Sequence, residues 1–162
     1  MIPKIEKILY ATDLSEHSRL PLSWAMALAR KHDASLVMLN VIEDFSSTPS
    51  VQVYFTDKEW QQVKQRIDNE AVDIMKRRLV DFCDEVKSGI PECTHVADEI
   101  IVRRGNPVEK IIAVAEENQC DIIVMGTLGT GWISGAIMGS TARRVIRRST
   151  LPVFVVPIDK AP

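Results

Sequence analysis

Ile122-Ile123-Val124-Met125 leads directly into Gly126-Thr127-Leu128-Gly129, so a short apolar run ends in a segment of closely spaced glycines. The run has no polar alternation, which is typical of a central parallel strand that is covered on both faces. The glycines continue to Gly139, and residues 140–148 have the pattern of a helix. A buried strand, a glycine loop and a helix in this order predict a βαβ unit, and this unit decides the fold class.

Four further strands are predicted by apolar runs elsewhere in the chain, at 8–12, 36–41, 99–103 and 153–156. Helical patterns separate them, over about 16–31, 56–88 and 107–118. Such alternation predicts right-handed crossovers and a parallel sheet with helices on both faces. We therefore expect an α/β fold, a Rossmann-like open sheet of five strands, in one domain that covers residues 1–162. The polar segment 43–56 is expected to form a loop inserted beside the ligand site.

Two of the predicted helices carry apolar stripes, and we assign the stripe of the long helix to the core. In the first helix, the stripe consists of Leu20, Trp24, Ala27 and Leu28. In the long helix, it consists of Trp60, Ile67 and Ile74. Thr56 and Glu59 form a capping-box pair, which places the start of the long helix.

Composition excludes several classes of protein. The chain has 162 residues with 20 Lys+Arg against 22 Asp+Glu, and its 46% hydrophobic content is that of an ordinary globular domain. A net charge of −2 argues against a protein that mainly grips nucleic-acid phosphates. No apolar run reaches the roughly 18 residues of a membrane span. Cys83, Cys93 and Cys120 have no metal-ligand spacing, so we expect reduced thiols and a cytoplasmic location.

The glycine segment predicts a site for a phosphate-bearing ligand. Five of the seven glycines lie between Gly126 and Gly139, and glycine lets backbone amides approach an anion closely. The helix that opens at Ser140 adds free amides and the positive end of a helix dipole. In open α/β sheets, ligands bind at the carboxyl ends of the strands, where this loop would lie. The alternative interpretation is that these glycines only serve turns.

Several motifs together carry a resemblance to a known family. The spacing Gly126-x2-Gly129-x9-Gly139-Ser140 is accompanied by Asp13-x-Ser15, by Gly105-Asn106-Pro107, and by the strand segments 121–127 and 151–157. In this combination the sequence closely resembles the nucleotide-binding members of the universal stress protein family. The resemblance covers nearly the whole chain. It implies a strand order of 3-2-1-4-5, a homodimer, and bound ATP, or ADP or AMP.

The resemblance also implies which residues contact the nucleotide. The backbone around five residues should hold ribose and phosphates: Gly126, Gly129, Gly139, Ser140 and Thr141. Asp13 should lie by the nucleoside and the Val41 backbone should meet the adenine edge, while Thr12 and Met125 line the same crevice. From its sequence context, Asp13 could instead be a helix-entry residue, since Asp before Ser15 suits a cap.

The chain departs from the family pattern in one respect. Many members carry His or Arg in the stretch that corresponds to Leu128 and Thr130, and this chain has neither there. We expect the phosphates to rest on amides, hydroxyls and the helix dipole, with Mg²⁺ neutralising much of their charge. No arginine-finger equivalent, catalytic residue or protein metal site is predicted. We interpret His17, His32 and His95 as surface residues, and Arg143, Arg144, Arg147 and Arg148 as a solvated basic face.

The function that these features favour is a cytoplasmic, adenine-nucleotide-binding regulatory or signalling module in stress response. The alternative is a slow ATPase or a phosphoryl- or nucleotidyl-transfer enzyme that uses the same crevice. A dimeric scaffold without nucleotide is a third class, which a broken glycine motif would favour. No membrane or nucleic-acid partner is expected.

We expect the homodimer to form through the strand Val153–Val156. In the order 3-2-1-4-5 this strand lies at the sheet edge, where unpaired backbone groups invite a second chain. Pro152 and Pro157 flank it and limit the pairing. The alternative is that a loop or the segment 158–162 covers this edge.

Overall fold

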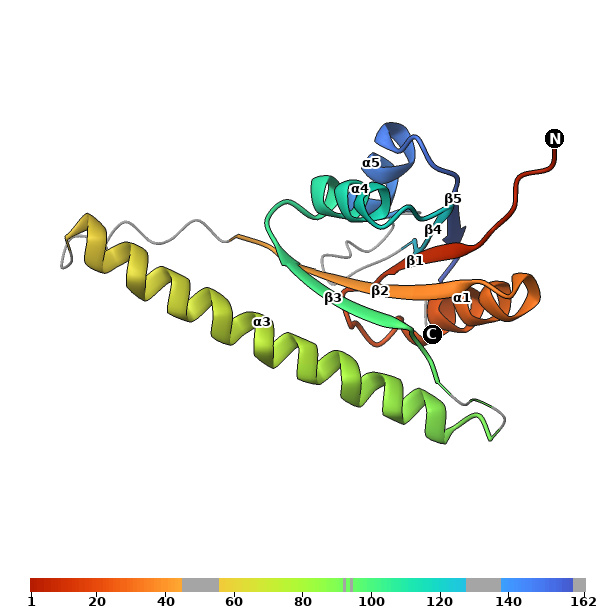
Figure 1. The fold of residues 1–162 in the computed structure, drawn as a ribbon, viewed down its shortest axis with the longest axis horizontal. Helices are drawn as coiled ribbons and strands as arrows, with labels where there is room; N and C mark the ends of the chain where they lie inside the picture. Colours follow the sequence, from red (N-terminus) through yellow and green to blue (C-terminus); the bar gives the residue numbers. More distant parts are fainter. Residues whose placement is uncertain (45–55, 92, 94, 128–137, 159–162) are drawn as a thin grey trace.

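The computed structural model describes residues 1–44, 56–91, 93, 95–127 and 138–158 (Figure 1). Its five strands form one parallel sheet in the order β3-β2-β1-β4-β5. The strands are β1 (Lys7–Ala11), β2 (Ser35–Ile42), β3 (Glu99–Arg104), β4 (Ile122–Gly126) and β5 (Val153–Val156). The predicted fold class and strand order are thus confirmed. The order reverses between β1 and β4, which is where open α/β sheets bind ligands.

Two layers of helices cover the sheet, one on each face (Figure 1). The helices are α1 (Arg19–His32), α3 (Asp57–Ser88), α4 (Pro107–Glu117) and α5 (Ser140–Arg148). One core joins α1 and α3 to side chains such as Tyr10 and Met38, and the other joins α4 and α5 to side chains such as Leu9 and Leu39. Alternate residues of a strand therefore enter opposite cores, as the two-residue period of a strand requires.

Local hydrogen bonds fix the starts of α3 and α4 as the sequence predicts. The Thr56 hydroxyl accepts from the Glu59 amide at 3.3 Å, and Glu59 Oε2 accepts from the Thr56 amide at 2.9 Å. These bonds complete a capping box. The backbone and hydroxyl bonds from Thr56 also lower the pKa of the Glu59 carboxyl. At α4, Asn106 Oδ1 accepts from the Glu109 amide at 3.2 Å.

The apolar stripe that the sequence shows on α1 is not the face that this helix buries. The residues that α1 buries are Pro21, Leu22 and Ala25, whereas Leu20 and Trp24 are 47% and 49% exposed. Ala27 is also exposed, and Leu28 is the one member of the stripe that packs against the core. The physical reason is that α1 has two apolar faces. The face with Trp24 turns toward the edge strand β5, where the centroid of the Trp24 ring lies 5.8 Å from that of the Phe154 ring.

The predicted core stripe of α3 is wrong for Ile67 and Ile74, while Trp60 is half-buried. Ile67 and Ile74 are 56% and 45% exposed, and the residues that α3 buries are Leu79 and Val86. With 32 residues α3 is about 48 Å long, whereas the eight residues of β2 span about 26 Å. The amino-terminal part of α3 therefore extends beyond the sheet (Figure 1). Only its carboxyl-terminal half has a sheet to pack against.

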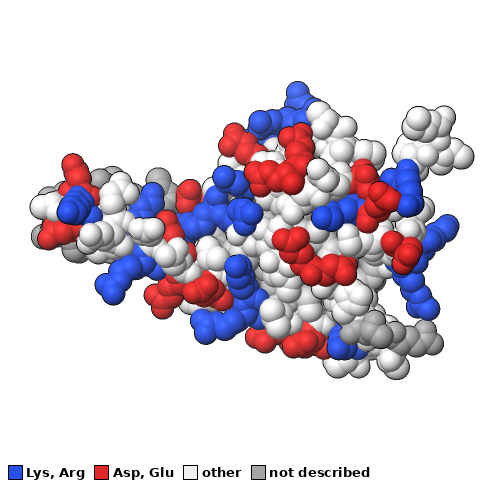
Figure 2. All heavy atoms as spheres, in the orientation of Figure 1, with Lys and Arg blue, Asp and Glu red and all other residues white. Residues whose placement is uncertain are grey.

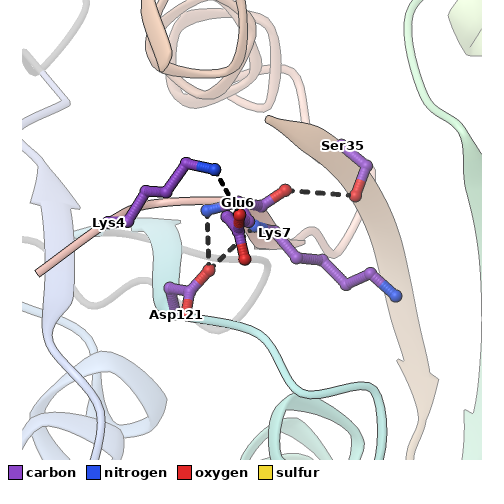
Figure 3. Close-up of polar contacts among 5 residues, drawn as sticks. All are labelled: Lys4, Glu6, Lys7, Ser35 and Asp121. Atoms are coloured by element: carbon purple, nitrogen blue, oxygen red, sulfur yellow. Dashed lines mark hydrogen bonds and ion pairs between the residues drawn. The ribbon is translucent and has the colours of Figure 1, made fainter. Parts of the chain in front are cut away.

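Hydrogen bonds lock the amino-terminal edge of the sheet (Figure 3). Asp121 Oδ2, just before β4, accepts from the backbone amides of Glu6 and Lys7 at 2.7 and 2.9 Å. The Glu6 carbonyl accepts from the Ser35 amide at 2.9 Å. These bonds tie β1, β2 and β4 together at their amino ends.

The surface carries both signs of charge. Figure 2 shows Lys and Arg interspersed with Asp and Glu over the displayed face, including the protruding part of α3. Such a pattern lacks the single-sign stripe that nucleic-acid binding requires on that face. Within the described part of the chain, no helix combines the length and apolarity that crossing a membrane would take.

Candidate functional site

A cavity of about 530 Å³ lies at the carboxyl ends of β1, β2 and β4 and at the amino end of α5. This volume falls in the range of roughly 300–1,000 Å³ that small-molecule sites occupy. Eight of the predicted site residues line it: Thr12, Asp13, Val41, Met125, Gly126, Gly139, Ser140 and Thr141. The ninth, Gly129, lies outside the described residues, as does most of the predicted loop 43–56, of which Glu43 lines the cavity.

The strand register gives Val41 a free backbone edge. The ladder between β1 and β2 ends where the Thr12 amide donates to the Leu39 carbonyl at 2.9 Å. Alternate residues of a strand direct both backbone groups toward the same neighbour, so the amide and carbonyl of Val41 face the β1 side beyond that last pair. One donor and one acceptor are thereby presented side by side at the cavity, which suits the edge of a planar heterocycle.

Asn40 contributes a buried acceptor to the same cavity. Its side chain is 4% exposed and its Nδ2 donates to the Thr12 carbonyl at 2.9 Å. Its Oδ1 has no hydrogen-bond partner among the described residues, although buried polar atoms nearly always have one. Because Asn40 lines the cavity, a ligand that donates a hydrogen bond there would satisfy this atom.

A polar network holds the loop between β1 and α1. Tyr10 donates to the Ser18 carbonyl at 2.7 Å, and Thr12 Oγ1 donates to Ser18 Oγ at 3.0 Å. Burial raises the pKa of Tyr10 to about 12, so its hydroxyl stays protonated as the donor. Asp13 Oδ1 accepts from the Ser15 amide at 3.0 Å and from the Ser18 hydroxyl at 3.4 Å.

These contacts show that Asp13 holds the turn before α1, but the N-cap of that helix is Ser18, without a side-chain cap hydrogen bond. Asp13 also lines the cavity and is exposed there. The contact of Asp13 with a nucleoside stays a prediction, and it is compatible with the hydrogen bonds that Asp13 makes in the turn.

The amino end of α5 supplies the anion-binding end of the cavity. Gly139 is the N-cap in an extended conformation, with φ −65° and ψ 159°, and the first turn has no acidic residue. The Gly139 amide donates to the Thr127 carbonyl at 2.6 Å, which anchors the helix start to the end of β4. The amides of the first turn have no partner within their own helix, and the helix dipole makes this end positive. Ser140 and Thr141 add hydroxyl donors.

Gly126 is closely packed, so a larger residue there would have to displace its neighbours. A Cβ at this position would lie 2.6 Å from Ile158 Cδ1 and 3.1 Å from Pro21 Cγ. The Ile158 amide also donates to Thr127 Oγ1 at 3.1 Å. The chain after β5 therefore folds back over the end of β4 and forms one wall of the cavity.

The cavity lining also includes residues that the sequence analysis did not assign to it, among them Asn40, His17 and Arg143. His17, which we assigned to the surface, is half-buried, with its side chain 26% exposed, and it lines the cavity. Arg143 was expected on a solvated face, and it is exposed, but it lines the cavity mouth at α5. For Asn40 a signal was present, because it is the one polar residue in the apolar run 36–41.

No group of three or more His, Cys, Asp or Glu side chains within the described ranges could hold a metal ion. Mg²⁺ characteristically keeps several waters and binds through substrate phosphates and one or two carboxylates. These residues therefore fit a metal that arrives with a phosphorylated ligand better than a resident metal.

Comparisons with known proteins agree with this architecture. The model of the universal stress protein family matches residues 4–157. Universal stress protein MJ0577 of Methanocaldococcus jannaschii is 28% identical over 159 residues, which cover 93% of this chain and 94% of that protein. The solved structure of MJ0577 superposes with a TM-score of 0.70 at 26% identity, over 98% of this chain and all of that one.

Two further solved structures of universal stress proteins share the fold and were determined with nucleotides. One is a complex with cAMP, at a TM-score of 0.59, 22% identity and coverage of 96% of this chain and 99% of that one. The other, from Archaeoglobus fulgidus, is a complex with dAMP, at a TM-score of 0.51, 22% identity and coverage of 93% and 96%. Since the family model spans nearly the whole of the sequence, the chain belongs to the universal stress protein family.

Proposed function

We propose that this protein binds an adenine nucleotide in the cavity at the carboxyl ends of β1, β2 and β4. The observation that carries the proposal is that one cavity joins two complementary ends. At one end, the Val41 backbone offers a donor and an acceptor to the edge of a base. At the other, the first turn of α5 offers amides and a positive dipole to phosphate.

The chemistry of the lining residues fits such a ligand. Adenine and ribose both carry hydrogen-bond donors, and Asn40 Oδ1 is a buried acceptor without a partner among the described residues. The relatives whose structures contain cAMP and dAMP are 22% identical to this chain, so their similarity supports the fold and not the ligand. The ligand class rests on the cavity itself. ATP, ADP and AMP share the groups that the cavity can recognise, and Mg²⁺ would be held mainly by the phosphates.

Family membership supports a regulatory or signalling role in stress response, and we propose the cytoplasm as its location. The three cysteines are free thiols, as a reducing compartment would keep them. A slow ATPase is the second candidate, and the half-buried His17 beside the cavity is the observation that favours it. An imidazole near the phosphates could accept a proton from an attacking water.

We further propose that the protein is a homodimer joined through β5. Among the described residues β5 pairs with β4 alone. The Pro152 carbonyl accepts from the Ile123 amide of β4, and the Val156 carbonyl accepts from the amide of Thr127, just after β4. The backbone groups of Val153 and Val155 therefore face the free edge. Trp24 and Phe154 add apolar surface beside it. Two such edges that meet antiparallel about a twofold axis would close the assembly.

The proposed function is tested in two steps. Mass spectrometry of small molecules released from the denatured, purified protein would identify a co-purified nucleotide. Calorimetric titration of the nucleotide-free protein with AMP, ADP and ATP, with and without Mg²⁺, would then give the affinities. We expect saturable binding of at least one of them with one site per chain. Absence of binding at millimolar concentrations of all three would contradict the proposal.

A further inference from the structure

Arg143 lies where a cation is electrostatically unfavourable in the ligand-free protein. It is the fourth residue of α5, and that helix has no acidic residue in its first turn. The amino end of a helix carries a partial positive charge that disfavours cations. None of the ion pairs found among the described residues includes Arg143. Among the described residues, the Arg143 guanidinium thus lies near a positive helix end without an ion pair to a carboxylate.

The position of Arg143 explains this arrangement if an anion enters the cavity. Helical side chains lean toward the amino end of their helix, over the residues three and four positions earlier, which for Arg143 are Ser140 and Gly139. Arg143 also lines the cavity together with those residues. A phosphate at the helix end would therefore meet amides, hydroxyls and a guanidinium at once.

A second observation points independently to a ligand in this cavity. Asn40 lines it from β2, is 4% exposed, and its Oδ1 has no partner among the described residues. Asn40 Oδ1 can accept a hydrogen bond from a ligand, whereas the free amides and positive dipole at the amino end of α5 favour an anion. A molecule that carries both, such as a phosphorylated nucleoside, would satisfy the two ends together.

We propose that Arg143 is the cation that pairs with the phosphate of the bound nucleotide and selects phosphorylated nucleosides over the free nucleoside. The inference rests on the proposed function and adds a residue to it. A guanidinium can donate two parallel hydrogen bonds to phosphate oxygens, which gives direction as well as charge. Arg143 thereby supplies a positive charge that the sequence analysis found missing at Leu128 and Thr130.

Arg144 provides a matched control. It neighbours Arg143 on the same helix, and both side chains are exposed, but Arg144 does not line the cavity. Arg143→Gln and Arg144→Gln therefore remove the same charge from the same turn. A larger loss of AMP affinity in Arg143→Gln than in Arg144→Gln would indicate direct pairing of Arg143 with the phosphate. Equal losses would indicate only a long-range effect of the surface charge.

The experiment is calorimetric titration of wild type, Arg143→Gln and Arg144→Gln with AMP and with adenosine, each at low and high NaCl. We expect Arg143→Gln to weaken AMP binding about tenfold at low salt, with adenosine affinity unchanged. Arg144→Gln should change AMP affinity by less than about twofold, and Arg143→Lys should recover part of the loss. Thermal unfolding of ligand-free Arg143→Gln should show an unchanged or higher midpoint, because an unfavourable charge has been removed.

Three results would overturn the inference. Equal weakening of AMP binding by both Gln variants would reduce Arg143 to a distant charge. Loss of adenosine affinity in parallel with AMP affinity would make its role one of packing. Unchanged AMP binding in Arg143→Gln would remove it from the site while leaving the proposed function intact. Failure of wild type to bind any nucleotide would instead refute the proposed function, and this inference with it.

Discussion

Replacing Asn40 by Leu should separate ligand binding from stability. Leu keeps a branched side chain of similar outline and removes both polar atoms. The free protein loses the bond from Nδ2 to the Thr12 carbonyl, and this buried carbonyl is left without that donor, which costs roughly 1–3 kcal/mol. It also loses a buried Oδ1 that has no partner among the described residues, and the burial of such an atom costs roughly 1–3 kcal/mol. Because these effects oppose each other, we expect the free energy of unfolding to change by no more than about 1 kcal/mol.

Nucleotide binding should respond differently. A ligand donor that bonds to Asn40 Oδ1 gains a hydrogen bond worth roughly 0.5–1.5 kcal/mol, so Asn40→Leu should weaken AMP affinity by about threefold to tenfold. Urea unfolding of the ligand-free protein gives the first quantity and calorimetric titration the second. Asn118→Leu is the control, because Asn118 also donates to a backbone carbonyl, that of Val114 at 2.8 Å, but lies outside the cavity lining.

The opposite pattern would refute this reasoning. If Asn40→Leu lowered the free energy of unfolding by more than about 3 kcal/mol while AMP affinity stayed the same, Asn40 would be a structural residue only. Its Oδ1 would then have no role in recognition.

Three further perturbations test other parts of the account. Val155→Pro removes a backbone donor that faces the free edge of β5 but none that bonds to β4. The sedimentation coefficient should therefore shift from that of a dimer toward that of a monomer, whereas Lys64→Ala should leave it unchanged. A wild-type monomer at micromolar concentration would contradict the dimer. Burial raises the pKa of Tyr10 from 10.0 to about 12, so the folded state keeps its proton where the unfolded state loses it. The corresponding stability should be complete below pH 10 and fall between pH 10 and 12 in urea unfolding, and Tyr10→Phe should flatten that part of the profile; an identical profile in the variant would argue against a buried Tyr10. Phosphate release from Mg²⁺-ATP should stay below about one turnover per second, and a faster rate that Asp13→Ala or His17→Ala abolishes would establish the enzyme instead.

What the sequence predicted correctly depends on local patterns. The apolar run 122–125 between polar and glycine residues indicates a buried strand in any context. Thr56 with Glu59, and Asn106 before Pro107, mark helix starts because their side chains bond to amides within one turn. Eight candidate site residues were brought to one cavity since parallel strands end at a common edge.

What the sequence did not predict depends on the sizes of the packed elements. The stripe with Ile67 has a helical period, but its burial needs a sheet beneath it, and α3 outruns the sheet. Trp24 lies on an apolar face that meets β5 near the sheet edge, a neighbour that periodicity cannot reveal. The positions of His17 and Arg143 at the cavity depend on how the loop after β1 and the start of α5 converge, which is a tertiary property.

The most direct test of the central claim is a map of backbone amide shifts in ¹H–¹⁵N NMR spectra as AMP is titrated into the nucleotide-free protein. If the cavity at the strand ends binds the nucleotide, the largest shifts should fall on Thr12, Asp13, Val41 and the first turn of α5. Amides of the protruding half of α3 should remain unmoved. Saturable shifts confined to another surface, or no shifts at millimolar AMP, would contradict the account.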